Sequence, residues 1–141
     1  MDLVLKAMAH MKRRMTAPVR LLYGLCLTLL AGAGVPAHAA GDSHRGEDVF
    51  AQECAECHSV REGKNKKGPS LFAIVGRKAA SIGDVVYSDA LRQSGLTWNA
   101  ASLDSYIAAP RKAVPNGKMK YDGLGDAKAR EDLVAYLATL H

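Results

Sequence analysis

Two cysteines and a histidine in a Cys-x-x-Cys-His run constrain this chain more than any other feature of its sequence. Cys54 and Cys57 are spaced so that both thiols can bond to the vinyl groups of a single haem. His58 follows directly, where its imidazole would lie beneath the haem iron as an axial ligand. The run therefore predicts a chain that folds around one covalently bound haem.

Three other uses of a Cys-x-x-Cys pair fit the sequence less well. A structural zinc site needs a second ligand pair at matching spacing, and the only other cysteine is Cys26. A thioredoxin-like redox pair belongs to a βαβ unit and needs no histidine after it. A disulfide across so short a span would leave His58 without a role. Haem attachment is therefore the preferred interpretation.

The N-terminal segment has the pattern of a secretory leader. Basic residues precede the apolar run 21–35, and Ala37-His38-Ala39 supplies small residues for a cleavage site. We therefore expect a signal peptide over residues 1–39, with translation starting at Met11, where Met-Lys-Arg-Arg would give a leader of ordinary length. The apolar run is short and glycine-rich for a transmembrane helix, and an uncleaved membrane anchor is the alternative.

Loss of this leader changes the composition of what remains. Five basic residues and one acidic residue leave with it, which lowers the formal net charge from +5 to about +1. That charge gives no reason to expect a nucleic acid as partner. Cys54 and Cys57 become the only cysteines, and both lie in the haem run, so no disulfide is available. Met119 becomes the only methionine.

Hydrophobic periodicity and capping residues predict four helices in residues 40–141. They are expected after Asp42-Ser43, from Ser88 to Gly95, from Asn99 or Ala100 to Pro110, and from near Asp126 onward. In the first, Phe50 recurs with Cys54 and Cys57 at helical spacing, so the three are expected to share a face. No apolar–polar alternation is long enough to predict a strand. The fold class is therefore all-α, in one domain over 40–141.

Residues 44–141 resemble a class I cytochrome c, the small soluble family of mitochondrial and bacterial electron carriers. The similarity includes Gly46 and Phe50 before the haem run and Leu133 and Tyr136 near the C-terminus. In that family these segments form two crossing helices, and the glycine lets their backbones approach closely. The resemblance implies about four helices wrapped around one covalent haem c, with the N- and C-terminal helices crossing.

The resemblance also implies the second iron ligand. Pro-Asn-Gly-Lys-Met, ending at Met119, is similar to the family's loop that brings a thioether to the iron. His44 and His141 are the alternative ligands, and both lie near the ends of the 40–141 domain. The usual form of the loop is Pro-Gly-Thr-Lys-Met, so this chain lacks a threonine hydroxyl and changes the residues of the turn.

Five further positions match supporting residues of the family. Pro69 corresponds to the proline whose carbonyl accepts the second ring N–H of the proximal histidine. Arg77, Tyr87 and Trp98 correspond to residues that bind a haem propionate. Tyr106 corresponds to a residue that forms a hydrogen bond near the methionine sulfur. The resemblance therefore predicts a polar shell around an otherwise apolar cofactor.

An iron with both axial positions occupied by His58 and Met119 has no site for a substrate. The sequence contains no nucleophile triad, carboxylate pair or phosphate-binding loop. We therefore predict an electron carrier and not an enzyme: a soluble monohaem c-type cytochrome of a periplasmic respiratory or photosynthetic chain. The alternative is a dedicated haem subunit of a dehydrogenase complex, for example in sulfur-compound oxidation. A gas-binding or peroxidatic haem protein is a weaker third candidate.

Basic residues gather in the two loops that the resemblance places beside the haem face. They are Lys64, Lys66, Lys67, Arg111, Lys112, Lys118 and Lys120. Acidic residues gather towards the ends of the domain, so a nearly neutral molecule would carry a dipole that steers it onto acidic docking surfaces of redox proteins. We expect an exported monomer that is not inserted in a membrane after cleavage.

Overall fold

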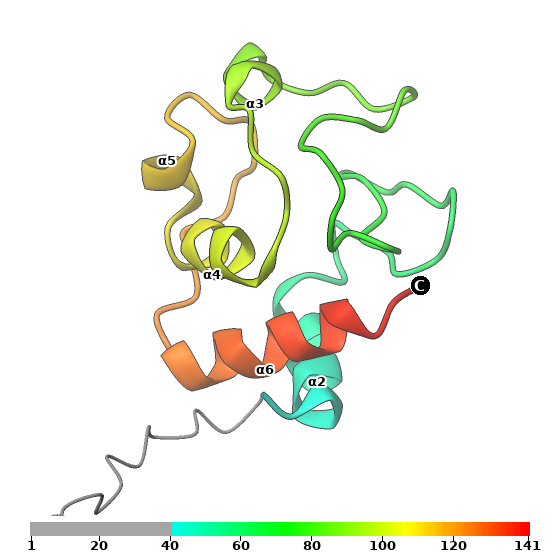
Figure 1. Ribbon diagram of the computed structural model, residues 1–141, viewed down its shortest axis with the longest axis vertical. Helices are drawn as coiled ribbons and strands as arrows, with labels where there is room; N and C mark the ends of the chain where they lie inside the picture. Colours follow the sequence, from blue (N-terminus) through cyan, green and yellow to red (C-terminus); the bar gives the residue numbers. More distant parts are fainter. Residues whose placement is uncertain (1–40) are drawn as a thin grey trace, which may run out of the picture. The chain divides into compact units, whose positions relative to one another are not determined.

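The computed structural model of the protein describes residues 41–141, which contain five helices. The helices are α2 (Ser43–Glu53), α3 (Asp89–Gln93), α4 (Ala100–Ala108), α5 (Pro110–Ala113) and α6 (Ala127–Ala138). Figure 1 shows a long irregular segment between α2 and α3 and a shorter one between α5 and α6. The predicted leader over 1–39, with its cleavage site and its start at Met11, lies outside the described residues.

The all-α prediction is confirmed. Over residues 41–141 the only β-type pairing is an isolated antiparallel bridge between Lys78 and Thr97. Within the same range no helix has both the length and the apolar character needed to cross a membrane.

Each of the four predicted helices is present and begins after a polar residue that caps it. The caps are Asp42 for α2, Ser88 for α3, Asn99 for α4 and Asp126 for α6. In every case a side-chain oxygen accepts a hydrogen bond from a backbone N–H of the first turn, which has no partner within the helix. The starts of these helices were therefore predictable from single residues.

Two features of the helices differ from the sequence prediction. α2 ends at Glu53, so Cys54 and Cys57 lie in the turn that follows the helix, whereas the prediction placed them on the helix itself. Pro110, which was expected only to stop a helix, also begins the one-turn helix α5. A proline fits the first turn of a helix because the N–H that it lacks would have no intrahelical partner there.

α2 and α6 cross at close range, as the resemblance predicted (Figure 1). A Cβ atom on Gly46 would lie 2.0 Å from the carbonyl oxygen of Asp132, so only glycine allows the two backbones to come this near. Beside this contact the rings of Phe50 and Tyr136 pack with centroids 5.8 Å apart. The crossing therefore depends on one missing side chain and one aromatic pair.

A buried carboxylate ties the start of α2 to α6. Asp132 is 3% exposed and accepts hydrogen bonds from the backbone N–H of Asp42 at 2.6 Å and from Nε of Arg45 at 2.9 Å. Lys128 adds an ion pair at 3.1 Å. The hydrogen bond from Arg45 is the main reason that the pKa of Asp132 lies far below its usual value. Asp132 is therefore ionised in the folded protein.

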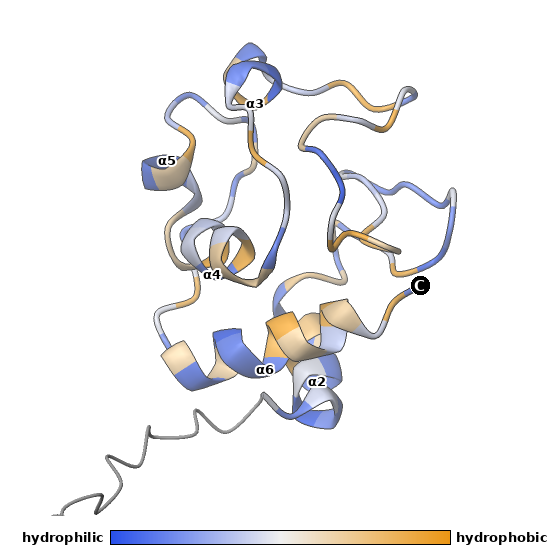
Figure 2. Cartoon of the chain, viewed as in Figure 1, coloured by the Kyte–Doolittle hydropathy of each residue, from blue (hydrophilic) through white to orange (hydrophobic). Residues whose placement is uncertain are grey.

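The hydrophobic core lies on the inner faces of α4 and α6. Leu133 and Leu137 of α6 are 0% and 2% exposed, and they pack with Leu103 and Ile107 of α4. Figure 2 shows hydrophobic residues of both helices among hydrophilic ones. The same four leucine and isoleucine side chains also line a cavity, so core and site share a wall.

Candidate haem site

All nine residues that the sequence singled out for the haem line one cavity of about 400 Å³. They are Cys54, Cys57, His58, Pro69, Arg77, Tyr87, Trp98, Tyr106 and Met119. Met119 follows His58 by sixty-one positions in the sequence, and the fold brings both to the same cavity. This convergence is what a cofactor bound by both segments requires.

Most of the remaining cavity wall is apolar. Besides the core residues of α4 and α6 it includes Leu71, Ile74, Val85, Val86 and Leu91. Val86 is 81% exposed, so one rim of the cavity presents an apolar side chain to solvent. The sequence did not indicate Leu71 and Ile74 as cavity residues, because they lie in a loop without hydrophobic periodicity. An apolar wall with a few polar groups fits a flat hydrophobic cofactor.

The turn after α2 places the two thiols and the histidine together. The carbonyl oxygen of Cys54 accepts hydrogen bonds from the backbone N–H of Cys57 at 3.1 Å and of His58 at 2.9 Å. Burial raises the pKa of the free Cys54 thiol to about 11. An uncharged thioether suits this apolar position better than a thiolate would.

The ring of His58 is fixed by its neighbours on the far side of the turn. Its Nδ1 lies 2.8 Å from the carbonyl oxygen of Pro69, which is the hydrogen bond that the resemblance predicted. Because a carbonyl oxygen only accepts, Nδ1 carries the proton and Nε2 keeps a free lone pair. Burial lowers the pKa of His58 and so favours this neutral form.

Gly68 allows the histidine ring to stand where it does. A Cβ atom at this position would lie 2.5 Å from Cε1 of His58 and 2.9 Å from its Nδ1. The backbone therefore touches the flat side of the imidazole, and no other residue type fits without moving the ring. The glycine and proline before Ser70 together set both the position and the tautomer of His58.

Arg77 lines the cavity, but its guanidinium bonds to the protein backbone. Nη1 donates to the carbonyl of Phe72 at 2.8 Å, and Nη2 donates to the carbonyl of Ser70 at 2.7 Å. Burial lowers the pKa of Arg77. The structure therefore gives this residue a role in holding the loop after Pro69, which the sequence did not indicate. Its predicted bond to a propionate remains a prediction.

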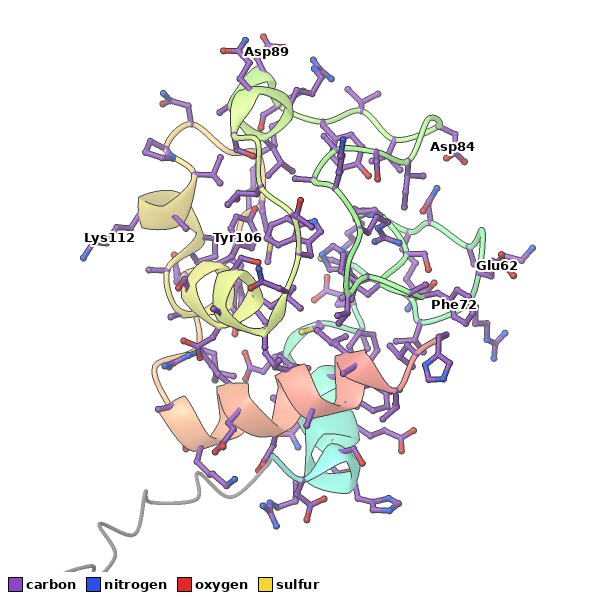
Figure 3. All side chains as sticks on the ribbon, in the orientation of Figure 1. Glu62, Phe72, Asp84, Asp89, Tyr106 and Lys112 are labelled. Atoms are coloured by element: carbon purple, nitrogen blue, oxygen red, sulfur yellow. The ribbon has the colours of Figure 1, made fainter. Side chains whose placement is uncertain are left out.

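Three aromatic residues from separate segments meet the cavity. Trp98 is 7% exposed and packs edge-on against Tyr106, with ring centroids 5.0 Å apart and an angle of 60° between the ring planes. Tyr106 projects from α4 and is labelled in Figure 3. Burial raises the pKa of Tyr87 and of Tyr106, so both hydroxyl groups stay protonated and can donate hydrogen bonds.

The loop that carries Met119 is shaped by an unusual backbone conformation at Asn116. Its φ is +64°, and the N–H of Gly117 donates to the carbonyl of Val114 at 3.1 Å, closing a tight turn. Asparagine is among the few non-glycine residues that adopt a left-handed conformation at low cost. The change from the family's usual Pro-Gly-Thr to Pro-Asn-Gly is therefore compatible with a turn here.

Several of the predicted basic residues border the same cavity. Lys67, Lys118 and Lys120 line it, together with Lys78, which is not among the basic residues predicted to lie beside the haem. Lys67 forms an ion pair with Glu56, next to the cysteine pair. Glu56 therefore compensates one of the positive charges that border the cavity, the charge beside the Cys-x-x-Cys-His run. Arg111 is likewise paired, with Asp122 at 3.2 Å.

The described residues offer no competing metal site. Nowhere in 41–141 do three or more His, Cys, Asp or Glu side chains gather so that they could bind a metal ion. Within these residues the structural zinc alternative therefore finds no support.

Known proteins point to the same cofactor. The family model described as "Cytochrome c" matches residues 43–141. Cytochrome c of Gibberella zeae is 44% identical over 100 residues, covering 70% of this chain and 94% of the relative. Cytochrome c2 of Rhodomicrobium vannielii is 46% identical over 106 residues, covering 74% and 84%. A solved structure, "cytochrome cH from Methylobacterium extorquens", superposes with a TM-score of 0.65 at 44% identity, covering 70% of this chain and 99% of that one. The chain belongs to the cytochrome c family, whose members carry one covalently attached haem c.

Proposed function

We propose that this protein carries single electrons through one haem c, held by Cys54 and Cys57, with its iron bound by His58 and Met119. The observation that supports this most directly is that all four side chains line one largely apolar cavity. The donor set fits haem iron, since a neutral imidazole and a thioether are the axial ligands found in cytochromes c. When bound, the haem supplies reversible exchange of one electron between ferric and ferrous iron.

The residues of the chain prepare this site in three ways. Pro69 and Gly68 hold His58 with Nε2 unprotonated, ready to bind. Met119 offers a soft, uncharged sulfur, which favours the reduced state. The wall around Leu133 and Ile74 excludes water and so disfavours the extra positive charge of the oxidised state. All three properties belong to a carrier with a raised reduction potential.

Two protein ligands would leave no coordination position for oxygen, peroxide or an organic substrate. In this proposal the protein is therefore an electron carrier and not an enzyme, and it exchanges electrons with other redox proteins. Lys118 and Lys120 border the cavity, so a partner with an acidic surface would dock over the same opening. We propose a monomer in the periplasm, exported by residues 1–39, in a respiratory or photosynthetic chain; its bacterial cytochrome c2 relatives support this location.

Carbon monoxide binding tests the ligand set. Reduced wild-type protein should not bind carbon monoxide at neutral pH, whereas Met119→Ala should bind it, because the substitution opens one axial position. Rapid binding by the wild type would overturn the proposal and favour a gas-binding haem protein. A His44→Ala variant is the matched control for the alternative ligand, and it should behave as the wild type does.

Cell fractionation and size-exclusion chromatography test the setting. The mature protein should appear in the periplasmic fraction, begin at Ala40 and migrate as a monomer. Co-purification with a larger dehydrogenase subunit would contradict the proposal of a free carrier and support the alternative of a dedicated haem subunit.

A further inference from the structure

The hydrogen bond that fixes His58 is the last link of a chain of hydrogen bonds that begins at the protein surface. The peptide unit between Pro69 and Ser70 bonds at both of its ends. Its carbonyl oxygen lies 2.8 Å from Nδ1 of His58, and its N–H donates to Oδ1 of Asn65 at 2.8 Å. Ser70 is 3% exposed, so this peptide unit has little contact with water.

The side chain of Asn65 continues the chain outwards. Its Nδ2 donates to Oδ2 of Asp84 at 3.1 Å, in the loop before α3. The orientation of the amide follows from its partners, because the N–H of Ser70 can only donate and a carboxylate can only accept. Asn65 is half-buried and Asp84 is exposed, so the chain runs from solvent to the imidazole.

The hydrogen bonds from Asp84 through Asn65 and the Pro69–Ser70 peptide unit to His58 all polarise one another in the same direction. The carboxylate of Asp84 accepts a hydrogen bond from the side-chain amide of Asn65 and polarises that amide. The amide oxygen of Asn65 thereby becomes a better acceptor for the N–H of Ser70. That bond in turn makes the carbonyl oxygen of Pro69 a better acceptor for His58, because hydrogen bonds in series strengthen one another in a low dielectric. The imidazole becomes more electron-rich, and an electron-rich ligand stabilises the oxidised iron.

We propose that Asn65 is a positioning residue that transmits the charge of Asp84 to the axial histidine and thereby lowers the reduction potential of the haem. The inference rests on the proposed role of His58 as an iron ligand. Neither residue lines the haem cavity; both line a second cavity of about 390 Å³ with Arg77, on the outer side of the loop after Pro69. Their hydrogen-bonded connection to His58 runs through this loop, and the charge of Asp84 also acts through space, as that of any nearby carboxylate does.

The test uses three single variants of the complete holoprotein. Asn65→Leu removes both hydrogen bonds at nearly constant shape, and Asp84→Asn removes only the charge at the outer end. Glu62→Gln is the matched control, because Glu62 is an exposed carboxylate on the same second cavity but accepts no hydrogen bond within this chain of groups. The measurements are the reduction potential and the proton chemical shifts of the Ser70 amide and of His58 Nδ1–H in the reduced, diamagnetic protein.

The order of the hydrogen bonds from Asp84 to His58 determines which variant should shift the reduction potential most. Asn65→Leu should raise the potential most and move both proton resonances upfield. Asp84→Asn should do the same to a smaller extent. Glu62→Gln should raise the potential less than Asp84→Asn and leave both resonances at their wild-type positions. In the Asn65→Leu background, Asp84→Asn should add no more than Glu62→Gln adds, because the connection is already broken.

Equal shifts of potential in Asp84→Asn and Glu62→Gln would show that charge acts through space alone and would overturn the proposal. So would additive effects of Asn65→Leu and Asp84→Asn. If Asn65→Leu does not yield holoprotein, the comparison of Asp84→Asn with Glu62→Gln decides alone, since both residues are exposed. Failure of the ligand assignment itself is distinguishable, because it would show in the ligand-sensitive spectra of the wild type before any variant is made.

Discussion

The crossing of α2 with α6 and the loop behind His58 are both held at close range, but by different means. In the crossing, the backbone groups of each helix form hydrogen bonds within that helix. Gly46 and Asp132 therefore only hold the two helices together, Gly46 by allowing close contact and Asp132 by binding Arg45. In the loop, side chains satisfy the backbone groups one at a time: Arg77 binds two carbonyls, and Asn65 binds an N–H. A segment that positions the proposed iron ligand without regular structure therefore relies on specific side-chain partners for its peptide groups.

Because of this difference, we expect the helix crossing to determine the stability of the fold and the loop to determine the properties of His58. Changes in the crossing should act mainly on the free energy of unfolding, while changes in the loop should act on the histidine and its spectrum. Four variants test this distinction, in decreasing order of their expected effect on the free energy of unfolding.

Gly46→Ala should have the largest effect. The added Cβ would lie 2.0 Å from the backbone oxygen of Asp132, so the helices must separate. We expect a loss of at least about 3 kcal/mol in the free energy of unfolding, which outweighs the gain in helix propensity of about 1 kcal/mol. Chemical denaturation of the holoprotein measures this loss. Gly83→Ala is the control, because its Cβ would meet no atom within 4 Å, and it should change stability by less than about 0.5 kcal/mol.

Gly68→Ala should have a smaller effect on stability and a larger one on the site. Its Cβ would press on the ring of His58 at 2.5 Å, and the exposed loop can move to relieve part of the contact. We expect a loss of about 2 kcal/mol. The electron paramagnetic resonance spectrum of the oxidised protein should change with it, because the ring turns. A loss of stability with an unchanged spectrum would mean that the glycine does not position the histidine.

Asp132→Asn should change how stability depends on pH. The pKa of Asp132 is lowered in the folded state, mainly by Arg45, so its ionisation stabilises the fold above the ordinary pKa of an aspartate. That contribution is complete above about pH 5 and is lost as the pH falls towards the lowered pKa. The variant should therefore be less stable than the wild type at pH 7, and the gap should narrow in acid. Thermal unfolding at several pH values measures both; a constant gap would contradict this role.

Reversing the charges of Lys118 and Lys120 to glutamate should leave stability within about 0.5 kcal/mol, since both border the cavity opening in a loop. Electron transfer to an acidic redox protein should slow by about tenfold at low ionic strength, and the difference should vanish at high salt. Stopped-flow kinetics over a salt series measures this. Equal rates at low salt would rule out steering by these lysines.

The sequence predicted the regular part of the fold well and the loops only where a resemblance supplied the role. The four helix starts were visible in Asp42, Ser88, Asn99 and Asp126, because capping is a property of neighbouring residues. The helix at Pro110 was not, because the same residue that stops one helix can begin the next.

The candidate site divides in the same way. Cys54 and His58 stand out by residue type and spacing, Met119 was indicated by the resemblance, and the structure places all three on one cavity. The bonds from Arg77 to its own loop and from Asn65 to Ser70 left no trace in the sequence, because they join residues whose distance depends on the folded loop. The role of Asp132 in joining α2 to α6 could not be predicted for a similar reason, since its partners Asp42 and Arg45 come from the other end of the domain.

A potentiometric titration of the wild type beside Met119→His tests the ligand pair most directly. We expect each protein to follow a single one-electron step, with the potential of the variant far below that of the wild type, because an imidazole favours oxidised iron where a thioether favours reduced iron. The haem should stay attached in both, since Cys54 and Cys57 are unchanged. Equal potentials in the two proteins would show that Met119 does not bind the iron and would contradict the proposed electron-transfer site.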